Sequence, residues 1–102
     1  MKSQDTTLSP SRNTKALYAA IHTLKDEKEI SAFFRDLLTP AEITEFTNRW
    51  QCVLLLEQGR PYLEIATKLG ISTTTVTRCA HWLNHGMGGY KTALSRTIPH
   101  TT

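Results

Sequence analysis

The stretch TPAEITEFTNRWQCVLLLEQG, residues 39–59, constrains the fold most, because it predicts a long helix that is apolar around more than half of its circumference. Thr39 is placed as the N-cap, Pro40 as the first helical residue and Glu42 as the partner that completes a capping box. Gly59 is placed to end the helix. A helix with apolar side chains on several faces must be covered on several sides, either by its own chain or by a partner.

The rest of the chain predicts further helices and no strands, because no alternating run is bounded by hairpin turns. A first helix is expected over residues 12–25. Asp26 is placed to cap a second helix, with Glu29 answering it. The apolar residues that this second helix should bury are Ile30, Phe33, Phe34, Leu37 and Leu38.

Three shorter helices are expected over residues 62–69, 73–84 and 90–97, which makes about six helices in an all-α fold. We expect one helical domain over residues 12–98, with flexible tails at 1–11 and 99–102. A chain of 102 residues buries a limited core, and an all-helical chain of this size often completes its core by pairing with a second copy.

Charge is distributed unevenly along the chain. Residues 1–59 carry seven Lys/Arg and eight Asp/Glu, a net charge of −1, whereas residues 60–102 carry five Lys/Arg and one Glu, a net charge of +4. The C-terminal part therefore favours a polyanionic partner, with a solvated basic surface as the alternative. No apolar run approaches the roughly 18 residues of a membrane span, and the polar N-terminus lacks the apolar centre of a signal peptide, so we expect no secretory signal. Cys52 and Cys79 form no C-x-x-C pair, so we expect a reduced, cytoplasmic protein without a disulfide.

Residues Tyr62 to His81 have the pattern of a helix-turn-helix. Ala66 offers the small side chain that lets the two helices pack closely, and Gly70 can take the positive φ of the turn. Ser72 is placed to cap the second helix. The side chains that point inward under this register are Ile65, Leu69, Ile71, Val76 and Cys79, and those that point outward are Thr73, Thr74, Thr75, Thr77, Arg78 and His81.

The outward-facing side chains suit a recognition helix in the major groove of DNA. Short threonines allow close approach and offer a hydroxyl to phosphate or base and a methyl to thymine, while Arg78 can reach guanine or phosphate. The predicted DNA-binding residues are Ser72, Thr73, Thr74, Thr75, Thr77, Arg78, His81, Lys68 and Arg60, with Lys91 and Arg96 as further phosphate contacts. The alternative is a helical module of the same shape that contacts only protein.

The motifs LLTPAEI, NRW, LLLEQG and EIATKLGISTTTVTRCAHWLNHG resemble the Trp repressor superfamily, in particular the small Trp-repressor-related DNA-binding proteins of bacteria. The resemblance covers about residues 30–95. It implies an intertwined homodimer that presents two recognition helices to a palindromic operator. The expected function is transcriptional regulation, with repression as the expected mode and the bacterial cytoplasm and nucleoid as the place.

The same resemblance implies an effector site. In Trp repressor, tryptophan binds between the central and recognition helices, and the positions that serve it match Thr39, Arg49 and Arg78 here. Cys79 and Trp82 stand where the family has small residues, and Asp36 stands where it has an apolar one. We therefore hypothesise that Trp82 fills the slot and that tryptophan is not the co-repressor. The alternatives are a different small carboxylate as effector and a purely structural ion pair between Arg49 and Glu45 or an acidic residue of the second helix.

Other chemistry has little support in the sequence. His81, His85 and Cys79 could in principle bind zinc, but the helical register directs Cys79 inward and His81 outward, so a metal site is not expected. The glycines of HGMGG follow a helix and lack the context of a phosphate loop. We expect no enzyme activity and no cofactor.

Overall fold

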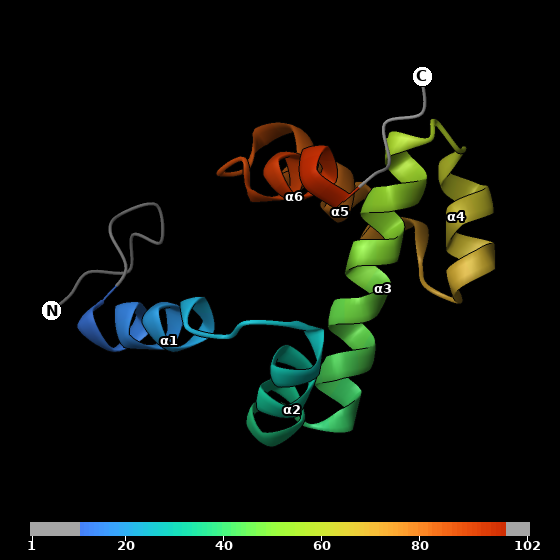
Figure 1. Ribbon diagram of the computed structural model, residues 1–102. Helices are drawn as coiled ribbons and strands as arrows, with labels where there is room; N and C mark the ends of the chain where they lie inside the picture. Colours follow the sequence, from blue (N-terminus) through green and yellow to red (C-terminus); the bar gives the residue numbers. More distant parts are fainter. Residues whose placement is uncertain (1–10, 98–102) are drawn as a thin grey trace, which may run out of the picture. The chain divides into compact units, whose positions relative to one another are not determined.

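The protein is all-α, as predicted, in a computed structural model that describes residues 11–97 (Figure 1). Its helices are α1 (Arg12–His22), α2 (Glu27–Leu37), α3 (Pro40–Glu57), α4 (Tyr62–Leu69), α5 (Thr73–His85) and α6 (Gly89–Thr97). Apart from Ser11, the predicted tails lie outside the described residues. The described chain divides into two compact units between Pro40 and Ala41. The expectation of a single domain stays a prediction.

The N-terminal unit holds α1 and α2, each with a capped N-terminus. Ser11 Oγ accepts a hydrogen bond from the Thr14 N–H at 3.1 Å, so the last residue of the predicted tail is the N-cap of α1. Asp26 caps α2 as predicted: its Oδ1 accepts from the Glu29 N–H at 2.9 Å, and Glu29 Oε1 accepts from the Lys25 N–H at 2.9 Å.

Two expectations for this unit are wrong. The first helix ends at His22 rather than Lys25, because the N–H groups of Thr23 and Leu24 bond the carbonyls three residues back in a tightened last turn. Ile30 and Leu37 are exposed rather than buried, at 38% and 47%, and neither α1 nor α2 contains a buried residue. Phe33, Phe34 and Leu38 are half-buried, so the apolar face of α2 is only partly covered within the described part of a single chain.

The C-terminal unit is built around α3 (Figure 1). One cluster packs Cys52 and Leu55 of α3 against α4 and α5, through Ile65, Ala66, Val76 and Cys79. A second cluster packs Val53 of α3 against Leu83 of α5 and Leu94 of α6. Adjacent residues of α3 thus serve two different cores, so its C-terminal half is covered on two sides by its own chain, whereas Phe46 in its N-terminal half is 47% exposed. Within the described residues, no helix is long and apolar enough to cross a membrane.

Candidate DNA-binding interface and effector cavity

Helices α4 and α5 form the helix-turn-helix that the sequence predicts. Gly70 ends α4 in the left-handed conformation at φ 69°, and the Ile71 N–H donates to the Ala66 carbonyl at 3.0 Å. Ile65 and Val76 are fully buried and Cys79 is 6% exposed, while Leu69 and Ile71 are half-buried against them. The predicted inward-facing set is therefore confirmed, and it holds α5 against both α3 and α4.

The first turn of α5 is held by its N-cap and keeps two threonines open. Ser72 Oγ accepts a hydrogen bond from the Thr75 N–H at 3.0 Å and lies 3.0 Å from the Thr75 hydroxyl. Thr73 and Thr74 are exposed, and their hydroxyls make no hydrogen bond within the described residues. Ser72 therefore satisfies the helix end, and the next two hydroxyls remain available to a ligand.

The other two threonines differ from the simple outward expectation. Thr75 is half-buried, because its hydroxyl turns toward Ser72 and its side chain lines a cavity. Thr77 is exposed, but its hydroxyl donates to the Thr73 carbonyl at 3.0 Å. A threonine bonded in this way still offers its methyl group and the lone pairs of its oxygen.

The predicted cations are not equivalent. Arg78 and Lys68 are exposed and form no ion pair within the described part of the chain. Arg60, just before α4, is bonded to Glu64 in the first turn of that helix, and both side chains are nearly half exposed. Part of the charge of Arg60 is therefore already compensated. The exposed His81 packs edge-on against Trp82, with ring centroids 5.0 Å apart. Lys91 and Arg96 are exposed on α6.

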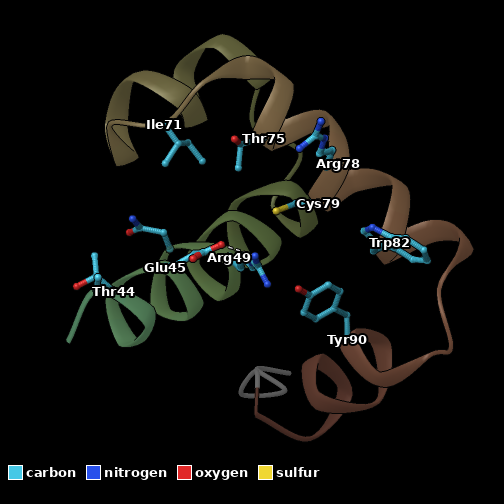
Figure 2. A pocket seen from close by; sticks show the side chains of 11 residues that line it. Thr44, Glu45, Arg49, Ile71, Thr75, Arg78, Cys79, Trp82 and Tyr90 are labelled. Carbon is cyan, nitrogen blue, oxygen red and sulfur yellow. Dashed lines mark hydrogen bonds and ion pairs between the residues drawn. The ribbon is translucent and has the colours of Figure 1, made fainter. Parts of the chain in front are cut away.

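A cavity of about 540 Å³ opens beside the recognition helix (Figure 2). Its walls come from α3, from the start and one face of α5, and from Tyr90 of α6. The lining residues are Ala41, Thr44, Glu45, Asn48, Arg49, Ile71, Thr75, Arg78, Cys79, Trp82 and Tyr90. The volume lies within the roughly 300–1,000 Å³ typical of small-molecule sites.

Arg49 and Arg78 both line this cavity, as the resemblance to the Trp repressor superfamily implies. Arg49 is bonded to Glu45 one turn earlier (Figure 2). Its guanidinium lies 5.6 Å from the centre of the Phe46 ring. The structural ion pair considered for Arg49 is thus present. Thr39 and Asp36 belong to the N-terminal unit and are not among the residues that line this cavity.

The hypothesis that Trp82 fills the slot is wrong for this structure. Trp82 is 59% exposed and forms one wall of the cavity, leaving the space open. Trp82 lies three residues after Cys79 on α5, and the His81 ring packs against its indole. Most of the indole stays outside the core.

Four cavity residues, Ala41, Thr44, Asn48 and Tyr90, were not anticipated from the sequence. Ala41, Thr44, Glu45, Asn48 and Arg49 recur at i, i+3, i+4, i+7 and i+8 along α3, so a small and polar stripe could have identified this wall. No sequence pattern indicated Tyr90, because only the tertiary structure brings α6 next to this cavity. It is half-buried, and burial, followed by the nearby Cys79, raises its pKa.

The two cysteines touch, which the sequence also did not indicate. The Cys52 thiol is completely buried in the same core cluster as Cys79, and neither cysteine forms a disulfide. Burial and then Cys79 raise the pKa of Cys52 to about 12. Within residues 11–97 no group of three or more His, Cys, Asp or Glu side chains could hold a metal ion.

Comparison with known proteins places this geometry in a family. Residues 12–98 match the Trp repressor protein family. The chain is 39% identical over 80 residues to the uncharacterized protein YerC of Bacillus subtilis (strain 168), covering 78% of this chain and 77% of YerC.

Two crystal structures are also similar. A TrpR-like protein from Eubacterium eligens ATCC 27750 superposes with a TM-score of 0.82 at 35% identity, covering 89% of this chain and 95% of that one. A proposed Trp repressor from Staphylococcus aureus gives a TM-score of 0.84 at 31% identity, covering 98% of this chain and 100% of that one. The chain therefore belongs to the Trp repressor family, whose members bind DNA and are not enzymes.

Proposed function

We propose that this protein is a transcriptional regulator that binds a specific palindromic DNA site as a homodimer. It would act in the bacterial cytoplasm as a repressor. One observation carries the proposal: the Ser72-capped start of α5 is exposed and keeps the hydroxyls of Thr73 and Thr74 free. The N-terminal residues of a recognition helix are those that meet base edges in the major groove.

The side chains of α5 and α4 suit two different kinds of contact, with DNA bases and with phosphates. Thr73 and Thr74 can donate to or accept from bases, whereas Thr77 contributes its methyl group and an acceptor. Arg78, with no ion pair among the described residues, suits guanine or a phosphate. Ser72, Lys68 and the α5 N–H groups suit phosphates, which position the protein without reading sequence.

Homodimer formation is supported by uncovered apolar surface. The apolar residues Ile30 and Leu37 of α2 are exposed, and α1 and α2 bury no residue within the described chain. A second copy that covers these helices would complete their core and set two recognition helices at a fixed spacing. Such symmetry matches half-sites about one helical turn apart.

Two substitutions test the DNA-binding proposal in gel-shift titrations. Arg78→Ala should weaken binding to a selected site by about 1–3 kcal/mol, and Lys68→Ala should weaken all DNA binding and lower the salt slope by about one. Lys28→Ala on α2 is the control, since it removes the same charge from an exposed position with no assigned role. A protein that shifts no DNA at low salt would refute the proposal and favour a protein-interaction module.

A second function is favoured by the open cavity. We propose that it holds a small carboxylate, because two guanidinium groups, the Thr44 hydroxyl and the Asn48 amide line it. Arg78 both lines the cavity and is exposed on α5, so a bound ligand would bear directly on the recognition helix. Since Trp82 leaves the space open, the reason for excluding tryptophan is lost, and tryptophan belongs among the candidates.

A thermal-shift screen of amino acids and small carboxylates tests the effector proposal. A true ligand stabilises the folded protein increasingly as its concentration L rises, following RT ln(1 + L/Kd), and Arg49→Ala should abolish that stabilisation. Phe46→Ala is the matched control, because it leaves the guanidinium in place while removing its exposed aromatic neighbour. Equal stabilisation of wild type and Arg49→Ala would place the ligand elsewhere.

A further inference from the structure

Cys52 and Cys79 join the two helices on which the proposed activity depends. Cys52 lies on the central helix α3 and Cys79 on the recognition helix α5, and the two side chains interact within one buried cluster. Both belong to the cluster that fixes α5 against α3 and α4. A chemical change at this pair would therefore act on the position of the recognition helix.

The two thiols differ in access and in protonation. Cys52 is 0% exposed, whereas Cys79 is 6% exposed and lines the cavity. Since burial holds the pKa of Cys52 at about 12, Cys52 keeps its proton at neutral pH and is not the first thiol to attack an oxidant. Cys79 is the thiol that a small molecule in the cavity can reach.

We propose that Cys79 and Cys52 are a peroxide-responsive dithiol whose oxidation to an intramolecular disulfide lowers the affinity of this protein for DNA. Cys79 is the thiol that meets the hydroperoxide, and Cys52 is the resolving thiol. The effect on DNA rests on the function proposed above, whereas formation of the disulfide does not.

The reaction balances in two steps. The Cys79 sulfur attacks the terminal oxygen of a hydroperoxide, the O–O bond breaks, and the peroxide leaves as an alcohol, or as water from hydrogen peroxide, while Cys79 becomes a sulfenic acid. The Cys52 sulfur then attacks the Cys79 sulfur, its proton passes to the departing hydroxyl, and water leaves. The two thiols lose two electrons, and the peroxide gains them. An added dithiol reverses the bond by exchange.

The disulfide would displace α5. A covalent bond holds two sulfur atoms closer than a non-bonded contact, so formation of the disulfide draws Cys79 of α5 toward Cys52 of α3. Arg78 and Thr77 directly precede Cys79 in α5, so the displacement reaches residues proposed to contact DNA. In a homodimer, both recognition helices would shift relative to half-sites at a fixed spacing.

The test compares reduced and peroxide-treated full-length protein in one preparation. Peptide mapping under non-reducing conditions should recover Cys52 joined to Cys79, in a protein lighter by two hydrogen atoms and still monomeric on a denaturing non-reducing gel. The oxidised protein should no longer shift DNA at concentrations where the reduced protein shifts all of it, and dithiothreitol should restore the shift.

Single variants provide the controls. Cys52→Ala leaves Cys79 without its resolving thiol, so peroxide should add oxygen to Cys79 and dithiothreitol should not reverse the higher oxidation states. Cys79→Ala should leave Cys52 unmodified, because Cys52 has no access to the cavity. If either variant fails to fold, the comparison of reduced and oxidised wild type decides the matter by itself.

Each contrary outcome has a distinct meaning. Two free thiols after peroxide treatment, or a disulfide between subunits instead of within one, would overturn the proposal. An intramolecular disulfide with unchanged DNA binding would overturn its regulatory half. A reduced protein that shifts no DNA would instead refute the function on which that half rests, while the mapping would still report on the dithiol.

Discussion

Replacing Ser72 with alanine should destabilise the recognition helix by removing its N-cap. Ser72 Oγ accepts from the Thr75 N–H at 3.0 Å and lies 3.0 Å from the Thr75 hydroxyl, so the substitution leaves that N–H without its partner. Loss of such a cap costs about 1 kcal/mol of the free energy of unfolding. The cost falls on a turn of threonines, which have low helix propensity, so the first turn of α5 should fray.

The chain offers a matched control at the start of α1. Ser11 Oγ accepts from the Thr14 N–H at 3.1 Å and lies 2.9 Å from the Thr14 hydroxyl, which repeats the geometry of Ser72 and Thr75 in another helix. Urea unfolding followed by circular dichroism, at one protein concentration, should show a similar loss of stability for Ser11→Ala and Ser72→Ala. Only Ser72→Ala should also weaken DNA binding, since its turn carries Thr73 and Thr74.

Two results would refute this reasoning. Unchanged unfolding midpoints for Ser72→Ala would mean that the cap does not stabilise α5. Equal loss of DNA affinity in both variants would mean that general destabilisation, rather than the start of α5, explains the effect.

Three further predictions concern packing and pH. Gly86→Ala should destabilise the protein because an added Cβ would clash with the Trp82 carbonyl oxygen, so the end of α5 must shift; a wild-type urea midpoint would contradict this. Ile65→Ala, at a fully buried side chain, should cost about 2–5 kcal/mol, whereas Leu63→Ala, on the same helix and 70% exposed, should change stability by less than about 0.5 kcal/mol. Burial raises the pKa of Cys52 from 9.0 to about 12, so the unfolded chain releases this proton first. The stabilisation from the protonated thiol is complete below pH 9.0 and is lost as pH rises toward 12. Cys52→Ala should therefore lose stability less steeply than wild type in that range.

Local chemistry made much of the fold predictable. Asp26 and Ser72 cap helices through bonds to residues three positions away, and Gly70 takes a conformation that side-chain-bearing residues avoid. These signals depend on a few neighbouring residues, so they survive without knowledge of the tertiary structure. The inward register of α5 was predictable for the same reason, since Val76 and Cys79 follow helical spacing.

The remaining features depend on how helices meet. Trp82 is apolar by composition, yet it is 59% exposed, whereas Cys79 and Leu83 of the same helix are buried. The contact between the Cys52 and Cys79 thiols arises from the packing of α3 on α5, over a separation that no sequence motif encodes. Ile30 is 38% exposed within the described part of the chain, and the sequence of α2 alone cannot reveal which surface would cover it.

Selection of DNA sites from a random pool by the purified full-length protein tests the central claim most directly. The account predicts an enriched inverted repeat, with half-sites about one helical turn apart, and loss of that enrichment with Arg78→Ala. Recovery of no common sequence, or of a site without inverted symmetry, would contradict sequence-specific binding by a symmetric dimer.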